Sequence, residues 1–440
     1  MGFDDFIKYS ILAIILYSYM ANLPVTIGSY RKYNYCRLCL SDRIATVIDL
    51  GYVPLAGAFH KKNSLSIPEL SYPLTLGFCE ACLTLQTLVV VEADSMFQNY
   101  YYRSSSINTL VTHFETISIL VNEVLKNKGK SFVVEIGCND GSLISSLREK
   151  KINAVGIDPA KNIVKPLIKK GLPIINDYFT FPLSRKIVKS HGKADIIYSA
   201  NTLAHIENMR DVFKGIKALL KKDGELIMEV HYLGTLITET QYDMMYHEHQ
   251  YYWSVTSLNN VLKPFGLEVF DVIKTSIHGG SAQFHIGHIN QHNITGNVIV
   301  LTSEEKKNKL NTKNSFHEFY KKILSEKKEL LKLLRSLKSQ KKSIAGYGAS
   351  GRGTILSSFC QLTSDYLDFV IDDSPAKQGA YTPFNHLPIV DSSILKKKAR
   401  PDYVLLFAWS FIEEIKKRNP KYIANGGKYI VPLPKVKVVK

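Results

Sequence analysis

Predicted strands and helices alternate along the chain from residue 131 onward, and this alternation restricts the possible folds more than any other feature. Buried apolar strands separated by amphipathic helices form a parallel sheet that helices cover on both faces. A second strand and glycine turn begin near residue 343, so we expect two α/β units in this chain of 440 residues. In the first unit, strands are expected at 131–136, 154–157, 173–175, 195–199 and 225–230, and helices at 143–151, 163–169 and 212–220.

A glycine turn follows the first of these strands and has the composition of a nucleoside-binding loop. In EIGCNDG, Gly137 and Gly141 remove side chains where the backbone approaches a ligand, and the next helix N-terminus offers free N–H groups. Asp158 ends the second strand, where an acidic residue typically binds the two ribose hydroxyls. The residues expected to bind the cofactor are Glu135, Gly137, Cys138, Asn139, Asp140, Gly141, Asp158, Asp177 and Asn201.

Two kinds of cofactor bind to turns of this type, a dinucleotide and S-adenosylmethionine. A dinucleotide site has the spacing G-x-G-x-x-G, which holds a pyrophosphate. Here the two glycines are separated by three residues and follow an acidic residue, Glu135, which suits a cationic sulfonium without a phosphate. The whole set of residues therefore favours S-adenosylmethionine, although a glycine turn alone discriminates poorly.

Six cysteines are too few for a disulfide framework in a chain of this length, and four of them form two pairs. The pairs are Cys36/Cys39 and Cys79/Cys82, each with the spacing C-x-x-C. This spacing lets both thiolates of a pair contact one ion, and two pairs complete the tetrahedral four-thiolate set of a structural zinc site. A redox motif explains one pair but not two, and two disulfides are the other alternative. We therefore expect structural Zn²⁺ and assign it to folding rather than catalysis.

The formal net charge of +17 suggests a nucleic-acid or anionic-surface binder at first sight. The excess is confined to two segments: residues 304–342 carry 13 basic and 5 acidic residues, and residues 396–440 carry 12 and 3. Neither segment contains the cofactor residues. We therefore interpret the charge as solvated faces of a helix and of a C-terminal segment, and expect no nucleic-acid partner.

The first 25 residues permit several interpretations. Residues 9–25 contain no charge, and 11–17 are strongly apolar, as in a signal anchor or an amphipathic helix. The stretch is short for a membrane span, acidic residues stand where a signal peptide has basic ones, and no cleavage site follows. Four free thiolates also imply a reducing compartment. We expect a cytoplasmic protein with an N-terminal extension, with Met20 as an alternative start and membrane association left open.

The segment Tyr246-His247-Glu248-His249 is the strongest candidate for acid–base chemistry. His205 lies just past the fourth predicted strand and is a second candidate. Two histidines flanking a glutamate could bind a metal, but two positions apart on a helix they would face different directions. Histidine titrates near neutral pH, and a neighbouring carboxylate can tune or orient it. Proton transfer is therefore the favoured role.

A long helix and a second glycine turn follow. Residues 304–342 have apolar residues at helical spacing and are expected to form one connecting helix. The segment GYGASGRGT then places four glycines between a strand at 343–346 and a helix, an arrangement that can hold a pyrophosphate or serve only close packing. Arg352 adds a positive charge, and a further strand at 369–372 ends in Asp372.

Taken together, the sequence resembles the C-methyltransferases that act on nucleotide-linked keto-sugars, over about residues 30–440. The matching segments are CRLC, GYVPLAGAF, CEAC, YYRSS, VVEIGCNDGSL, GIDP, NTLAHIEN, YHEHQYYWS, HGGS, IAGYGASGRGT, DDSPAKQGAYTPFNHLPI, LLFAWSFIEEI and GGKYIVPLP. Three positions depart from the family pattern: Gln283 and Arg352 stand where relatives usually carry Arg and Lys, and Asp373 stands where they tend to have a basic or neutral residue.

The resemblance implies roles for individual residues. His249 matches the proposed general base, and Tyr246, Glu248, His205 and Tyr102 match further active-site positions. The implied reaction removes the proton on the carbon beside a ketone, usually C3 beside a C4 ketone, and the enolate then takes the methyl group of S-adenosylmethionine. Residues expected to bind the nucleotide-linked sugar are Gly346, Tyr347, Gly348, Ser350, Arg352, Gly353, Asp372, Lys377, His278 and Gly279.

The sequence thus predicts an α/β protein that combines a small four-cysteine zinc module, a Rossmann-like class I methyltransferase domain and a second Rossmann-like domain, and that acts as a monomer. The expected divisions are an extension at 1–30, the zinc module at 31–90, the methyltransferase domain at 91–303, a connector at 304–342 and a nucleotide-sugar domain at 343–440. Alternative functions are O- or N-methylation of another sugar or a nucleic acid, and a scaffold that has lost activity.

Overall fold

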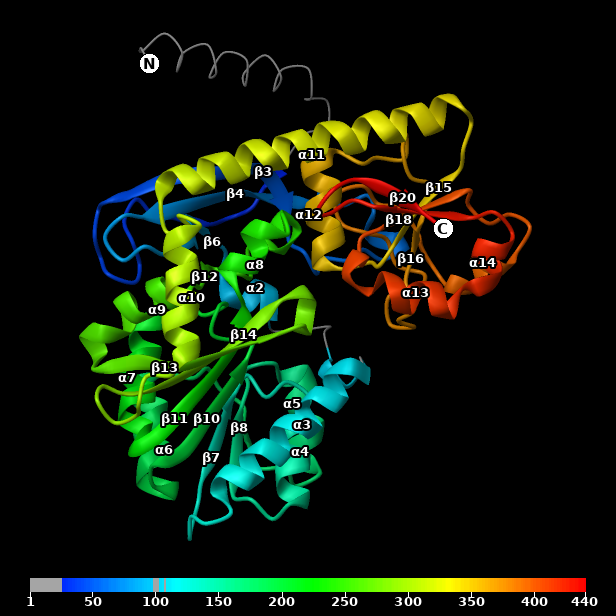
Figure 1. The fold of residues 1–440 in the computed structure, drawn as a ribbon. Helices are drawn as coiled ribbons and strands as arrows, with labels where there is room; N and C mark the ends of the chain where they lie inside the picture. The colour runs from blue at the N-terminus through cyan, green and yellow to red at the C-terminus, as the bar shows by residue number, and fades with distance from the viewer. Residues whose placement is uncertain (1–25, 98–102, 107) are drawn as a thin grey trace, which may run out of the picture.

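The computed structural model describes residues 26–97, 103–106 and 108–440. The predicted active-site residue Tyr102 and most of the predicted N-terminal extension lie outside these residues. Three large sheets and one two-stranded pair organise the described chain, and Figure 1 shows the large sheets as a lower lobe, an upper strip and a lobe to the right. The four-cysteine cluster and the two α/β units predicted from the sequence are all present.

The central sheet has seven strands in the order β13-β14-β11-β10-β7-β8-β9. The neighbouring strands from β11 to β9 pair in parallel, β14 runs antiparallel to β11, and β13 pairs antiparallel with β14 and so runs in the same direction as the five parallel strands. The strands are β7 (Val133–Ile136), β8 (Ala154–Ile157), β9 (Ile174–Ile175), β10 (Ala194–Ala200), β11 (Leu220–His231), β13 (Leu267–Thr275) and β14 (Ser281–His288). Each expected strand of the first unit is therefore present, with ends shifted by a few residues.

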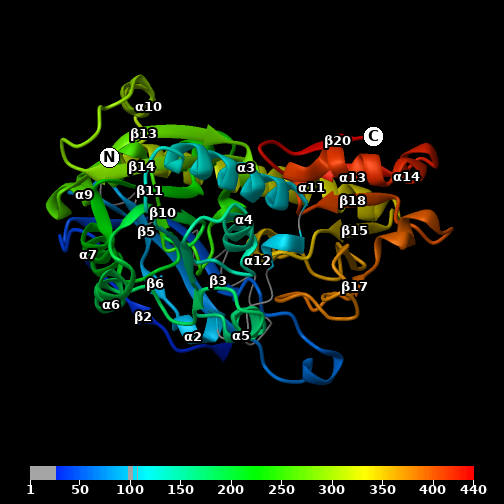
Figure 2. The same ribbon diagram turned by 90° about the horizontal axis from the view of Figure 1, so that it is seen from below.

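Helices cover both faces of this sheet, as the alternation predicted. One core lies under helices α6 (Phe181–His191), α7 (Met209–Leu219) and α9 (Val255–Leu262). The opposite core lies under α3 (Asn108–Leu125), α4 (Ser142–Glu149) and α5 (Lys161–Lys169), as Figures 1 and 2 show. The first unit therefore has three layers, with its strand ends open toward the other two sheets.

The N-terminal sheet contains a strand from the middle of the chain. Its strands β1 (Thr26–Ile27), β3 (Ile44–Pro54), β4 (Leu70–Cys79) and β5 (Leu85–Thr87) are joined by β12 (Tyr251–Tyr252), which pairs antiparallel with β5. The short strands β2 (Arg31–Lys32) and β6 (Val89–Val90) form a separate pair. Because β12 directly follows the YHEH segment, this pairing fixes that segment between two sheets.

The third sheet has six strands in the order β17-β16-β15-β18-β19-β20. They are β15 (Ile344–Tyr347), β16 (Val370–Ile371), β17 (Ile389–Val390), β18 (Tyr403–Leu406), β19 (Lys428–Val431) and β20 (Lys437–Val439). The second glycine turn joins β15 to α12 (Gly351–Cys360), and α13 (Ile412–Arg418) and α14 (Pro420–Ala424) follow. The sheet shares one continuous apolar core with the N-terminal sheet.

The prediction of a single helix over 304–342 is wrong at its start. The chain forms α10 (Gly296–Lys307), breaks, and then forms α11 (Lys313–Ser339), which runs along the top of Figure 1. Glu305 causes α10 to pack inward: its buried carboxylate accepts hydrogen bonds from the N–H groups of Val255 and Thr256 at the start of α9. Lys309 then adopts a left-handed conformation (φ 52°), and Thr312 caps α11.

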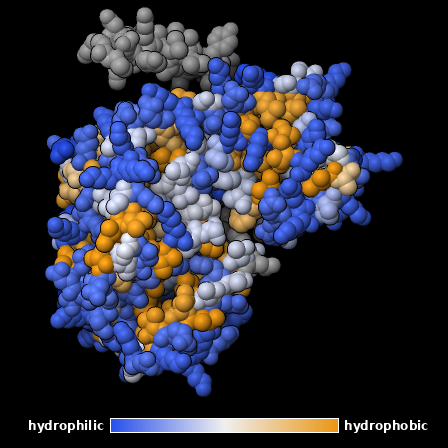
Figure 3. Space-filling view, viewed as in Figure 1, coloured by the Kyte–Doolittle hydropathy of each residue, from blue (hydrophilic) through white to orange (hydrophobic). Residues whose placement is uncertain are grey.

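The charged faces of these segments are exposed. Six of the eight apolar positions in the helical repeat of α11 are buried, while most of its lysines are exposed. In the view of Figure 3, hydrophilic residues cover most of the molecule and apolar residues form smaller separate groups. Among the described residues, no helix is both long enough and apolar enough to cross a bilayer.

Candidate functional site

The four cysteines of the two C-x-x-C pairs form one cluster. Cys36 Sγ lies 3.6 Å from Cys82 Sγ, and Cys39 Sγ lies 3.6 Å from Cys79 Sγ. These separations are too long for disulfides and agree with the edge of about 3.8 Å that a tetrahedron of thiolates around zinc requires. All four thiols are free, and Gln86 Nε2 donates to Cys36 Sγ (3.0 Å). The donor set therefore fits a closed structural zinc site.

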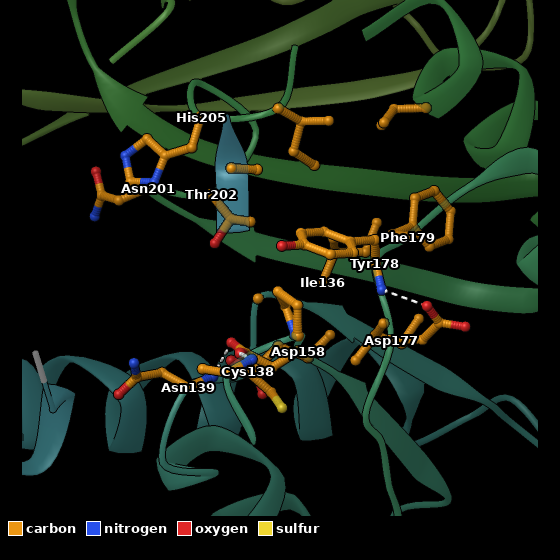
Figure 4. A pocket seen from close by; sticks show the side chains of 18 of the residues that line it. Ile136, Cys138, Asn139, Asp158, Asp177, Tyr178, Phe179, Asn201, Thr202 and His205 are labelled. Atoms are coloured by element: carbon orange, nitrogen blue, oxygen red, sulfur yellow. Dashed lines mark hydrogen bonds between the residues drawn. The ribbon is translucent and has the colours of Figure 1, made fainter. Parts of the chain in front are cut away.

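The cofactor cavity lies at the carboxyl ends of the central strands. It has a volume of about 470 Å³, within the range of pockets that enclose a small ligand. Figure 4 shows Asn139, Cys138 and Asp158 on one side and Asn201, Thr202 and His205 on the other. Its lining includes most of the residues predicted to bind the cofactor: Glu135, Gly137, Cys138, Asn139, Asp140, Asp158, Asp177 and Asn201.

Both glycines of the first turn have left-handed backbones. Gly137 has φ +80°, and a Cβ atom there would lie 1.9 Å from Thr202 Oγ1. Gly141 has φ +71° and precedes α4 as its N-cap residue. Any larger side chain at Gly137 would collide with Thr202, a residue of the cavity wall, so this position requires glycine for both backbone and space.

Buried carboxylates surround the cavity and suit a cationic ligand. Burial raises the pKa of Asp158, and burial together with the charges of Asp158 and Asp140 raises the pKa of Glu135 well above its ordinary value. Glu135 Oε2 is buried and has no hydrogen-bond partner among the described residues. A positive charge placed beside these groups would relieve their repulsion and lower both pKa values. The cavity therefore fits the sulfonium of S-adenosylmethionine.

Asn139 and Asp140 also hold a segment that borders the cavity. Asn139 Oδ1 accepts from the Ser104 N–H (3.1 Å), and Asp140 Oδ2 accepts from the Ser105 N–H (2.8 Å). Both serines belong to a short 3₁₀ turn, Ser104–Ser106. Asn139 and Asp140 therefore line the cavity and also anchor the segment that precedes α3.

Sequence reasoning missed several residues of the cavity wall. Tyr178 and Phe179 follow Asp177 at the end of β9, and Thr202 follows Asn201 at the end of β10. The Asp177 carboxylate accepts a hydrogen bond from the Tyr178 N–H (2.8 Å). Their position just past a parallel strand was the signal that could have identified them, because ligands bind at this edge of such sheets.

Gly137→Ala is expected to weaken S-adenosylmethionine binding at least about tenfold, because a strained backbone and the displaced Thr202 side chain would both alter the cavity. Isothermal titration calorimetry measures this change. Gly129→Ala is the matched control, since a Cβ there has nothing within 4 Å. Equal affinities of the two variants would contradict this account of the turn.

The YHEH segment is a loop rather than a helix and brings its last histidine against His205. The His249 ring lies 5.0 Å from the His205 ring at 20° and 3.9 Å from the Tyr246 ring. His249 Nδ1 lies 2.8 Å from the Met244 carbonyl oxygen. A carbonyl only accepts, so Nδ1 carries the proton and Nε2 keeps its lone pair. His205 lines the cofactor cavity, whereas His249 is outside the lining and stacks against the His205 ring.

His247 has a different environment. Its Nε2 lies 3.2 Å from the Pro73 carbonyl oxygen, and its ring contacts Tyr72 on β4. His247 therefore ties the loop to the N-terminal sheet. Among the described residues, the YHEH segment contains no group of three metal-ligating side chains.

Burial keeps the histidines around this loop neutral. It lowers the pKa of both His205 and His247 to about 4 and that of His249 well below its ordinary value, the nearby His205 adding to the effect at His249. A neutral imidazole is the form that accepts a proton. The imidazoles of this loop are therefore in the neutral form at neutral pH.

These depressed pKa values predict that acid destabilises the fold. In the unfolded chain the same imidazoles protonate near pH 6.5, whereas the folded ones at 205 and 247 resist protonation until about pH 4. Below pH 6.5 the unfolded state therefore binds more protons, and each such histidine lowers the free energy of unfolding by up to about 1.4 kcal/mol per pH unit. Urea unfolding at pH 7.5 and 5.5 measures this loss.

Two variants test whether the buried histidines cause this pH dependence of stability. His247→Gln can still donate to Pro73, so its unfolding free energy should fall less steeply with pH than that of the wild-type protein. His317→Gln, at an exposed position of α11, should leave the slope unchanged. Identical slopes in all three proteins would contradict the role of buried imidazoles.

The second glycine turn is closely packed. Cβ atoms at Gly346 and Gly353 would lie 2.6 and 3.0 Å from the Phe407 ring, and one at Gly348 (φ +100°) would lie 2.8 Å from Ala408 Cβ. Ser350 caps α12 by accepting a hydrogen bond from the Gly353 N–H. Close packing alone therefore accounts for three glycines, and a pyrophosphate at this turn stays a prediction.

The other residues predicted to bind substrate in this domain contact one another. Lys377 Nζ donates to the Ala349 carbonyl (2.7 Å) and lies 3.3 Å from Asp372 Oδ2. Tyr347 OH donates to Asp373 Oδ2 (2.7 Å), which Arg418 also contacts at 3.2 Å. Asp373, one of the departures from the family pattern, therefore pairs with groups of its own domain.

Residues far apart in the sequence meet between the central and third sheets. Arg352 Nε donates to the buried carboxylate of Asp243 (2.8 Å), and its Nη1 donates to Ser410 Oγ (3.2 Å). A Cβ atom at Gly279 would lie 3.8 Å from Arg352 Nη1 and 3.6 Å from Gln241 Nε2. His278 lies in this region, and burial lowers its pKa to about 4. The structure thus brings His278 and Gly279 close to Arg352 of the second glycine turn, all of which are predicted to bind substrate. The Arg352 guanidinium is already paired with Asp243.

Gln283, another departure from the family pattern, contacts a buried carboxylate on β11. Its Nε2 donates to Glu229 Oε2 (2.6 Å), which also lies 2.8 Å from His113 Nε2 on α3. Glu229 is completely buried. An arginine at 283 would neutralise this carboxylate, whereas glutamine only donates a hydrogen bond to it.

Comparison with known proteins defines the class of this protein. Family models match three consecutive parts of the chain: a zinc binding domain over residues 36–97, a methyltransferase domain over 112–272 and a C-methyltransferase C-terminal domain over 276–434. The fold, the cavity and the four cysteines are therefore those of an S-adenosylmethionine-dependent methyltransferase that carries a structural zinc site.

A full-length relative defines the family. The chain is 30% identical to C-methyltransferase NovU of Streptomyces niveus over 410 residues, which span 93% of this chain and 97% of that protein. It belongs to this family of S-adenosylmethionine-dependent C-methyltransferases.

Solved structures resemble a smaller part of the chain. The PH0226 protein of Pyrococcus horikoshii is 16% identical and covers 45% of this chain and 99% of its own, with a TM-score of 0.34. An S-adenosylmethionine-dependent methyltransferase of Clostridium acetobutylicum is 14% identical and covers 40% and 91%, with a TM-score of 0.32.

Proposed function

We propose that the enzyme transfers a methyl group to C3 of a nucleotide-linked 4-keto-deoxyhexose. The observation that carries this proposal is His249, a buried neutral imidazole whose Nδ1 donates to the Met244 carbonyl, so that Nε2 is basic. A carbon acid beside a ketone needs a positioned base, whereas many O-methyltransferases rely mainly on proximity. The comparison with a C-methyltransferase supports carbon as the methyl acceptor.

In this proposal the chain supplies the proton transfer and the positioning. S-adenosylmethionine supplies an electrophilic methyl group when it is bound. His249 Nε2 accepts the proton from C3, and the negative charge moves to the ketone oxygen as an enolate. His205 and Tyr246, whose rings flank His249, orient its imidazole, and Glu248 and Tyr102 are further candidates for contact with the sugar. A hydrogen-bond donor to the enolate oxygen would stabilise this charge.

The nucleotide is proposed to lie between the central and third sheets. This region borders the YHEH loop and contains Gly279, His278 and Arg352, which supports the placement. The remaining substrate candidates are Gly346, Tyr347, Gly348, Ser350, Gly353, Asp372 and Lys377. We further propose that the enzyme is cytoplasmic, because four zinc-binding thiolates require a reducing compartment. We also propose that it acts as a monomer.

Hydrogen exchange at carbon tests the reaction. The enzyme and a thymidine diphosphate-linked 4-keto-6-deoxyglucose are mixed in D₂O without S-adenosylmethionine, and ¹H NMR follows the C3 proton. Enzyme-dependent exchange at C3, followed by a new C–CH₃ signal when the cofactor is added, is the expected result. Methyl transfer to oxygen or nitrogen without exchange would instead support the alternative O- or N-methyltransferase.

A further inference from the structure

Three metal-ligating side chains meet outside the sites described so far. His60 follows β3, Glu69 precedes β4, and His386 precedes β17. His60 Nε2 lies 2.6 Å from Glu69 Oε1, and His386 Nε2 lies 3.7 Å from Glu69 Oε2. One ligand atom of each residue lies within 4.8 Å of the others.

The His386 imidazole is incompletely satisfied in this cluster. Its Nε2 is shielded from solvent and makes no hydrogen bond, since the Glu69 oxygen at 3.7 Å is too distant for one. The His60 and His386 rings lie 4.8 Å apart in an edge-to-face arrangement. A shielded ring nitrogen without a partner is costly, and a cation held between the three groups would satisfy its lone pair in the matching tautomer.

We propose that His60, Glu69 and His386 bind one divalent transition-metal ion, with zinc as the first choice, separate from the four-cysteine site. Two imidazoles and one carboxylate form a recurrent ligand set for zinc and for other first-row metals. Ligands at about 2.0–2.1 Å from zinc lie about 3.3 Å apart, so the pair at 3.7 Å needs little movement and the pair at 2.6 Å must open slightly. A water molecule would complete the tetrahedron.

The surrounding backbone fixes the carboxylate and one histidine segment. Glu69 Oε2 also accepts a hydrogen bond from the Phe384 N–H (2.7 Å). His60 and Tyr381 form an isolated antiparallel bridge, with the Tyr381 N–H donating to the His60 carbonyl (2.9 Å). Such outer hydrogen bonds orient metal ligands. The ligands therefore come from two preformed segments that already contact each other.

An ion at this site would link two distant parts of the chain. It would join the 55–69 segment, between two strands of the N-terminal sheet, to the third sheet more than 300 residues later. Phe59, next to His60, lines a small cavity together with Gly348 and Ser350 of the second glycine turn. An ion at His60 would therefore hold Phe59 against the turn for which substrate binding is predicted.

Metal content tests the proposal directly. The purified protein is treated with a mild chelator that leaves the thiolate-bound zinc, and ZnCl₂ is then titrated into it by calorimetry. One additional zinc per chain is expected to bind. His386→Asn and Glu69→Gln should each weaken this second event at least about 100-fold, because even the loss of an outer ligand partner costs about 10–100-fold. His317→Asn, at an exposed position of α11, should bind like the wild-type protein.

X-ray absorption at the zinc edge tests the ligands without relying on a variant. Wild-type protein with two zinc ions per chain should show nitrogen and oxygen neighbours in addition to sulfur, and protein with one zinc should show sulfur alone. A titration that ends at one zinc per chain would overturn the proposal and leave a hydrogen-bonded cluster. So would a second ion whose affinity is unchanged in His386→Asn.

Discussion

Replacing His249 with glutamine is expected to lower kcat for methyl transfer at least about 100-fold, since positioned general bases contribute about 10²–10⁴ in rate. Glutamine can still donate to the Met244 carbonyl, so the loop should keep its conformation, but it offers no basic nitrogen. The binding of S-adenosylmethionine should stay within a few-fold of the wild-type affinity, because His249 lies behind His205 rather than in the lining of the cavity. Single-turnover assays and calorimetry measure the two effects separately.

The control for this variant is His317→Gln, which changes an exposed histidine on α11 and should turn over normally. Deuterium exchange at the sugar C3 should disappear with methyl transfer in His249→Gln, because both steps need the same base. Full turnover by this variant would remove His249 from the mechanism. The acidic limb of the wild-type kcat/KM profile should also lie below pH 6.5, because burial holds the pKa of His249 well below that value.

The local sequence pattern predicted the central sheet and its cavity. Three of the five expected strands, 131–136, 154–157 and 225–230, were bounded by polar or glycine residues on both sides. The functional residues lay at strand ends, where parallel sheets bind ligands. Glu135, Gly137 and Asp158 therefore came together as the topology requires. The resemblance to a family supplied what local pattern could not, namely the role of His249 in a loop with no regular period.

Contacts between distant segments were beyond the reach of local pattern. Glu305 fits a helical repeat, yet its carboxylate caps α9, about 50 residues earlier in the chain. Arg352 looked like a phosphate ligand because it follows a glycine turn, and only the fold reveals Asp243 beside it. The pairing of β12 with β5 has the same origin. In each case a buried polar group or strand edge found a partner that the sequence places far away.

Removing zinc is expected to unfold more than the module that binds it. Three of the four cysteines belong to the apolar core that also contains Phe213 and Trp253 of the methyltransferase domain. Arg210 on α7 donates to the Leu38 carbonyl (2.7 Å), between the first two cysteines. The zinc site is therefore part of the wall against which α7 and α9 pack, and its loss should loosen the central domain as well.

The size of this effect follows from the energy of zinc binding. A structural zinc ion contributes about 10–16 kcal/mol of apparent binding free energy, which equals or exceeds the net stability of about 5–15 kcal/mol of a typical domain. Cys82→Ser should therefore lose zinc and melt at least about 10 °C below the wild-type protein, and a strong chelator should have the same effect on the wild type. Cys360→Ser is the matched control, because this buried cysteine contacts Tyr242 and lies outside the cluster. Differential scanning calorimetry with zinc quantification by mass spectrometry measures both, and a chelated protein that keeps its melting temperature would contradict a structural role for the ion.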